Sequence, residues 1–266
     1  MFATYALLIE VWRRILAEWR AQVSFGDAAR IWFVSNLGKY VPGKVWQILA
    51  MGSMAREIDV QPAAAAGSAI LSTVVNIAMG GVVAVVAGWK ALDAVTQGHA
   101  ALGIVLAGAL MIGVLLVPVT IPPLLRIAER LTGRTLSLGD LPKRAVYVAI
   151  VGNIFAWVMY GWSFQLLVRG VLGSATGSLA QYTAAYAVSY IIGYLVFLIP
   201  GGVGPRELAL IASLTSMGLA NPKEAAVIAV TSRLWLTVLE ILPGLLYLAR
   251  RPGRAMTSTP RDGSNP

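Results

Sequence analysis

The sequence predicts an all-α membrane protein: a polytopic helical bundle with inverted repeats and two broken, re-entrant helical hairpins at Pro-Gly motifs. Charged residues are scarce, long apolar runs recur, and two Pro-Gly steps interrupt shorter apolar stretches. Of the 266 residues, 58% are hydrophobic and 12% are charged, whereas charged residues make up about 25% of a soluble domain. The mean hydropathy of +0.74 agrees with this reading. A soluble fold of this length could not bury so much apolar surface.

Five apolar runs are long enough to cross a bilayer as helices, which takes about 20 residues. They are Pro62–Trp89, His99–Leu125, Ala145–Val168, Leu179–Ile199 and Glu224–Ala249. Backbone groups cannot remain unpaired in hydrocarbon, so these runs are expected to be α-helical. The N-terminal apolar run is expected to be the tail of a membrane helix that leads into an Arg-rich stretch.

Two Pro-Gly steps separate stretches of about half that length. Pro42-Gly43 lies between Ala28–Val41 and Lys44–Ala55, and Pro200-Gly201-Gly202 precedes Val203–Met217. Proline removes a backbone donor and glycine relaxes the chain, so helices break at these points. Broken backbone at membrane depth is tolerated only where protein or a water-filled cavity surrounds it.

The two breaks begin matching segments. Each is followed by a short apolar stretch and then by a polar residue and a proline that start a long Ala-rich run, at Gln61-Pro62 and Asn221-Pro222. The prolines lie 20 residues apart in the first segment (42 to 62) and 22 in the second (200 to 222). Three predicted spans, His99–Leu125, Ala145–Val168 and Leu179–Ile199, lie between the two repeats, so the hairpins should enter from opposite faces. Such inverted repeats are typical of transporters. The alternative is that both steps merely kink packed helices.

Basic residues predict the orientation, because they favour the cytoplasmic side. The N-terminal Arg-rich stretch, the connection Arg126–Arg144 and the C-terminal tail are predicted to be cytoplasmic. Residues 1–250 are expected to form the transmembrane domain, and residues 251–266 a disordered cytoplasmic tail. The net charge of +9 is attributed to orientation and to anionic lipids, and no nucleic-acid partner is expected.

Six ionisable residues are expected near the breaks or inside the last span: Lys39, Lys44, Arg206, Glu207, Arg233 and Glu240. A charge at that depth costs about 2.5–3.5 kcal/mol on insertion scales, so such residues line cavities or form pairs. The predicted pairs are Glu207 with Arg233 and Arg206 with Glu240. Two interpretations stay open: the cations capture a phosphate, or the pairs hold the hairpin against the last span.

The composition argues against an enzyme. Cysteine is absent, which excludes thiolate catalysis and zinc-thiolate sites, and the single histidine is expected in a loop. The sequence has only 12 acidic residues, no evident metal-type carboxylate cluster and no Walker-type loop. We therefore expect no catalytic residues, no metal and no cofactor.

The residues around both breaks also carry a family resemblance. Asn36–Trp46 (NLGKYVPGKVW) closely resembles the first signature of the lysylphosphatidylglycerol synthase transmembrane region, also called the flippase-like domain family. Pro200–Glu207 (PGGVGPRE) is similar to its second signature, and Arg233 matches an arginine of a late helix. The resemblance covers nearly all of residues 1–250. Family members usually open with a complete helix that this chain is expected to lack, and the soluble synthase domain of two-domain relatives is not expected either.

The resemblance implies a flippase-like protein of the bacterial inner membrane that moves an anionic or aminoacylated phospholipid between leaflets. The alternatives are a carrier for a polyprenyl-phosphate-linked sugar and a non-transporting scaffold for a partner enzyme. The expected partners are the lipid substrate and membrane lipids, and a homo-oligomer stays open. The predicted substrate-binding residues are Lys39, Tyr40, Pro42, Gly43, Lys44, Pro200, Gly201, Gly202, Gly204, Arg206, Glu207, Arg233 and Glu240.

Overall fold

The computed structural model describes residues 1–41, 45–88, 142–196 and 202–249, with six isolated positions between 101 and 113. Within these ranges all regular secondary structure is helical, which confirms the predicted all-α class. The elements in chain order are α1 (Phe2–Glu18), α2 (Phe25–Asn36), the short 3₁₀ helix η1 (Leu37–Tyr40), α3 (Val45–Arg56), α4 (Pro62–Ala87), α7 (Lys143–Leu172), α8 (Leu179–Leu195), α9 (Pro205–Ser216) and α10 (Pro222–Ala249).

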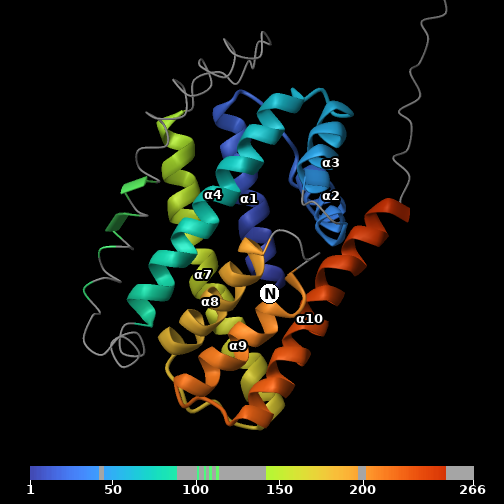
Figure 1. Cartoon of the computed structure of the whole chain (residues 1–266). Coiled ribbons are helices and arrows are strands. Elements are labelled where there is room, and N and C mark those ends of the chain that lie inside the picture. The colour runs from blue at the N-terminus through green and yellow to red at the C-terminus, as the bar shows by residue number, and fades with distance from the viewer. Residues whose placement is uncertain are drawn as a thin grey trace, which may run out of the picture.

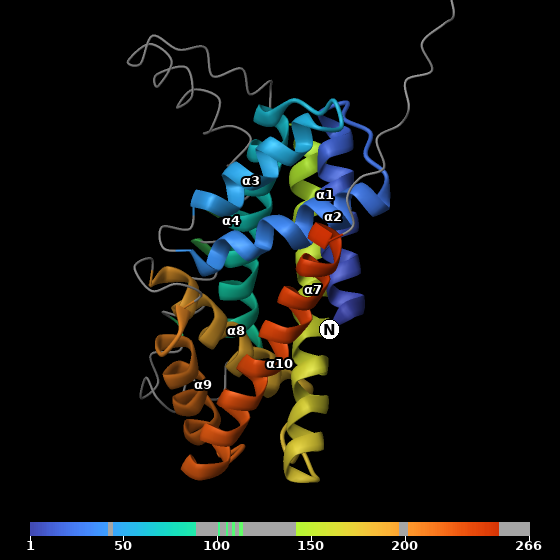
Figure 2. The same cartoon turned by 90° about the vertical axis from the view of Figure 1, so that its right-hand side faces the viewer.

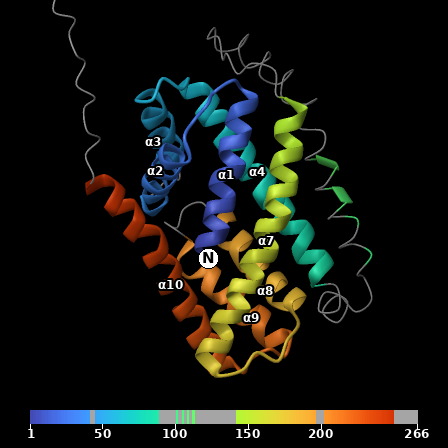
Figure 3. The same cartoon turned by 180° about the vertical axis from the view of Figure 1, so that it is seen from behind.

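Three described helices, α4, α7 and α10, are long and apolar enough to cross a membrane. They confirm three of the five predicted spans. The predicted span His99–Leu125 lies outside the described residues, apart from the isolated positions. Figure 1 shows α7 running from the top to the bottom of the molecule, α4 descending from the top beside it, and α10 rising on the opposite side. In the view from behind, α1 lies alongside the first half of α7 (Figure 3).

Helix α8 is shorter than the predicted span Leu179–Ile199. It has 17 residues, and its C-cap Val196 already has a ψ of 87°, so the backbone leaves the helix four residues before Pro200. Apolar content alone did not reveal this early end. Helix α8 is therefore one arm of the second hairpin, and it packs along α9.

The two hairpins form an inverted pair. Helices α3 and α9 each have 12 residues, and five residues (57–61 and 217–221) connect each to a long helix that begins with proline. A proline is favourable there because the first helical N–H has no partner within the helix. The α2–α3 hairpin lies at one end of the bundle and the α8–α9 hairpin at the other, and α4 and α10 run in opposite directions (Figures 1 and 2). This confirms the predicted inversion.

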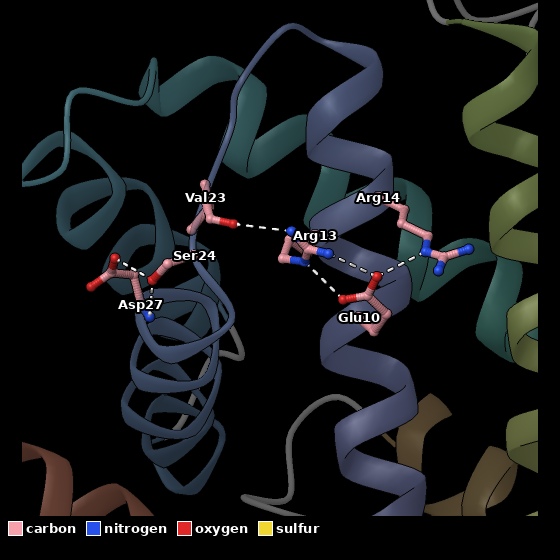
Figure 4. Close-up of polar contacts among 6 residues, drawn as sticks. All are labelled: Glu10, Arg13, Arg14, Val23, Ser24 and Asp27. Atoms are coloured by element: carbon pink, nitrogen blue, oxygen red, sulfur yellow. Dashed lines mark hydrogen bonds and ion pairs between the residues drawn. The ribbon is translucent and has the colours of Figure 1, made fainter.

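A charge cluster fixes the connection between α1 and α2. Glu10 accepts hydrogen bonds from Arg13 Nε at 2.7 Å and Arg14 Nε at 2.8 Å. Arg13 also donates to the carbonyl oxygen of Val23 at 3.5 Å, and the Ser24 hydroxyl caps the start of α2 (Figure 4). Helix α1 continues past the apolar residues at its start, includes Arg13 and Arg14, and ends at Glu18.

Close helix contacts rely on glycines along α7. A Cβ at Gly152 would lie 2.2 Å from Val11 of α1, and one at Gly161 would lie 1.8 Å from Thr183 Oγ1 of α8. Amide groups also join the helices: Asn76 Nδ2 donates to Asn153 Oδ1 at 2.6 Å. Small residues and interhelical hydrogen bonds of this kind hold membrane helices together, because lipid supplies no hydrophobic drive between them.

We predict that Gly161→Ala destabilises the bundle. Its Cβ would also lie 2.8 Å from the Thr183 Cα, so backbone must move, and overpacking costs about 1–3 kcal/mol. Thermal unfolding of the purified protein in detergent should show a midpoint lowered by several degrees. Gly170→Ala is the matched control on the same helix, because no atom lies within 4 Å of its added methyl. Equal midpoints for the two variants would contradict this packing.

Candidate functional site

A cavity of about 160 Å³, with charged and polar side chains in its lining, lies where the two hairpins meet the long helices. One water needs about 10–15 Å³ of such space, so the cavity can hold a hydrated polar group larger than water. Its lining draws on both hairpins as well as on α1, α4, α7 and α10. Four of its lining residues are charged: Lys39, Arg206, Arg233 and Glu240.

Glu240 is held by three donors. The 3₁₀ helix η1 brings Lys39 to the Glu240 carboxylate in an ion pair. The hydroxyl groups of Tyr5 and Tyr40 donate to the same carboxylate at 3.2 and 2.9 Å. The predicted pairing of Arg206 with Glu240 is therefore wrong, since Lys39, from the first hairpin, is the ion-pair partner. The contact joins the chain before the first break to the last span.

Arg206 lies in an aromatic environment. Its guanidinium carbon is 5.3 Å from the ring centroids of both Tyr186 and Tyr190 on α8, at cation–π distance. Within the described ranges, the ion pairs formed by Glu207 and Glu240 go to other cations, and no carboxylate lies within the 4.0 Å ion-pair distance of Arg206. The charge of Arg206 is thus stabilised by the faces of the Tyr186 and Tyr190 rings and by the polar side chains that line the cavity.

Two glycines let the second break pack tightly enough to place Arg206. A Cβ at Gly193 would lie 2.7 Å from the Arg206 Cβ, and a Cβ at Gly202 would lie 2.4 Å from the Gly193 carbonyl oxygen. Gly202 and Gly204 also have positive φ values of 68° and 93°, which other residues rarely adopt. The predicted glycines 202 and 204 therefore shape the backbone that carries Arg206.

The predicted pair of Glu207 and Arg233 is confirmed. Arg233 Nε lies 3.5 Å from Glu207 Oε1, while Glu207 Oε2 accepts a hydrogen bond from the Gly204 N–H at 2.6 Å. A carboxylate at this position stabilises the start of α9. Glu207 thus has a structural role, and it fixes Arg233 of α10 beside the cavity.

Sequence reasoning missed most of the tyrosines in the cavity. Besides Tyr5, the lining contains Tyr160, Tyr186, Tyr190 and Tyr194. The last three recur every four residues along α8, which places them on one helix face. That spacing was the available signal, but the sequence alone could not tell an interhelical hydrogen-bonding stripe from a cavity wall.

The structure brings together the predicted site residues that it describes. Lys39, Arg206, Arg233 and Glu240 line the cavity, and Tyr40 and Glu207 contact these residues. Five further residues lie outside the described ranges: Pro42, Gly43, Lys44, Pro200 and Gly201. Among the described residues there is no group of three metal-binding side chains of the His, Cys, Asp or Glu type.

The model of one protein family, the lysylphosphatidylglycerol synthase TM region, matches residues 1–244. The chain therefore belongs to this family of membrane proteins, as the signatures around the two breaks predicted. No curated protein and no solved structure matched the chain.

We predict that Lys39 and Glu240 are energetically coupled. Removing one member of a shielded ion pair strands the other charge, whereas removing both does not. Lys39→Gln and Glu240→Gln should each lower the thermal midpoint in detergent, and the double variant should lose less than the sum of the two shifts. The coupling expected for contacting residues is about 0.5–3 kcal/mol. Strictly additive shifts would rule out this contact.

Proposed function

We propose that this protein moves a phosphate-bearing lipid between the two leaflets, with the lipid headgroup passing through the central cavity. The observation that carries the proposal is the position of Arg206. It is a cation without a carboxylate partner among the described residues, and it lines a cavity where two oppositely directed hairpins meet. Arginine binds phosphate oxygens through charge-assisted hydrogen bonds.

The inverted arrangement suits movement across a membrane. In transporters built from inverted repeats, one repeat rocks against the other around a fixed central site. Here the first hairpin supplies Lys39 and the second supplies Arg206, so relative movement of the hairpins would open the cavity toward one leaflet or the other. The contact between Lys39 and Glu240 is a polar link that such a movement can break and remake.

The outer surface suits lipid tails. Large apolar side chains are exposed along α7 and α10, among them Phe155, Trp162 and Leu234, with exposed fractions of 61%, 57% and 62%. A lipid could keep its acyl chains against this surface while its headgroup enters the cavity. We propose that the lipid is not chemically altered, and that the protein works in a bacterial inner membrane with its C-terminus cytoplasmic.

Two lipid classes meet these requirements. The first is an anionic or aminoacylated phospholipid. The second is a polyprenyl-phosphate-linked sugar, which is favoured by the amides and tyrosine hydroxyls of the cavity because sugar hydroxyls bind such groups. A non-transporting scaffold would not require a partly buried cation that has no carboxylate partner in the part of the chain that the structure describes.

We predict that Arg206→Gln strongly slows lipid movement. Hydrogen bonds to charged groups contribute about 1.5–3 kcal/mol each, so the rate should fall at least about tenfold. The measurement is the accessibility of a fluorescent phospholipid in liposomes that contain the purified protein. Arg169→Gln is the matched control, because Arg169 is exposed at the end of α7 and away from the cavity. A wild-type rate in Arg206→Gln would contradict the proposal.

A further inference from the structure

The charges of the described site do not cancel. Lys39 is paired with Glu240, and Arg233 is paired with Glu207. Arg206 remains, with two tyrosine rings but no carboxylate within ion-pair distance among the described residues. Three cations therefore face two carboxylates, and the described site carries one excess positive charge. A shielded site of this kind favours a ligand that supplies the missing negative charge.

The carboxylate and two of the amide oxygens in the described cavity lining already accept hydrogen bonds. Glu240, the only carboxylate among the described lining residues, accepts from Lys39 and from two tyrosine hydroxyls. The amide oxygens of Asn36 and Asn153 accept from Gln47 and Asn76. The rings of Tyr186 and Tyr190 lie at cation–π distance from the Arg206 guanidinium. A ligand ammonium group would therefore find no unpaired carboxylate in the described lining and would have to compete with Lys39 for Glu240.

We infer that the headgroup bound here is a phosphodiester with a net charge of −1. This inference rests on the proposed function and narrows its substrate class. One diester phosphate neutralises Arg206 and leaves both ion pairs intact. A zwitterionic or aminoacylated headgroup brings ammonium groups, for which the described lining has no unpaired carboxylate. A phosphate monoester or diphosphate brings a second negative charge, which among the described cations of the site only Lys39 or Arg233 could meet by leaving its carboxylate.

Binding of short-chain lipids to the protein in detergent tests the inference without requiring transport. Dihexanoyl phosphatidylglycerol and a short isoprenyl phosphoryl hexose are both diesters of charge −1, and they represent the two possible sources. The comparison lipids, of equal chain length, are phosphatidylethanolamine, lysyl-phosphatidylglycerol and phosphatidic acid. At least one diester should bind about tenfold or more tightly than all three comparison lipids. Equal or tighter binding of any comparison lipid would overturn the inference.

Two charge variants should shift the preference in opposite directions. Glu240→Gln removes a negative charge, so phosphatidic acid should gain affinity relative to phosphatidylglycerol. Lys39→Gln removes a positive charge and frees the Glu240 carboxylate as an acceptor, so phosphatidylethanolamine should gain instead. Arg169→Gln is the control and should leave the ranking unchanged. A ranking that stays the same in both charge variants would overturn the inference, and either variant alone suffices if the other does not fold.

The two proposals fail in different ways. Selective binding of a diester without any movement in liposomes would remove the transport proposal and leave the charge inference in place. Movement of all headgroups at equal rates, with equal binding in detergent, would overturn the charge inference and leave transport in place.

Discussion

The structure depends on one constraint: a positively charged side chain inside a membrane protein needs partners that stabilise its charge. A guanidinium in such a place is costly unless an anion, a π face or polar groups surround it. Arg206 is placed between two tyrosine rings of α8, while Lys39 and Arg233 each have a carboxylate partner. Because every partner comes from another helix, the same contacts that stabilise the charges also hold the two hairpins and the last span together.

The break between α8 and α9 places the start of a helix at the cavity. A continuous helix would keep its backbone groups bonded internally and would present only side chains to the centre. By ending α8 at Leu195 and restarting α9 at Pro205, the chain brings the first turn of α9 to the cavity. The positive end of that helix then adds to the charge of Arg206. Glycines 193 and 202 allow this because no side chain fits between them.

The sequence was informative where local chemistry decides the structure. Proline and glycine predicted both breaks, the matching segments predicted the inversion, and two charges on α9 and α10 predicted the pair of Glu207 with Arg233. The partner of Glu240 could not be predicted, because the direction of Lys39 depends on the 3₁₀ turn of η1 and on how the first hairpin packs. The end of α8 and the enclosure of Arg206 by tyrosines likewise depend on tertiary packing, which apolar content does not encode.

The most direct test of the account is solid-state NMR of the ¹⁵N-arginine-labelled protein in phosphatidylglycerol bilayers, measuring ¹⁵N–³¹P dipolar coupling. The account expects a guanidinium signal that couples strongly to lipid phosphorus and disappears in Arg206→Lys, which identifies it as Arg206. Coupling confined to signals that persist in Arg206→Lys would show that lipid phosphate meets only other arginines. The cavity would then not be a phosphate site, and the central claim would be wrong.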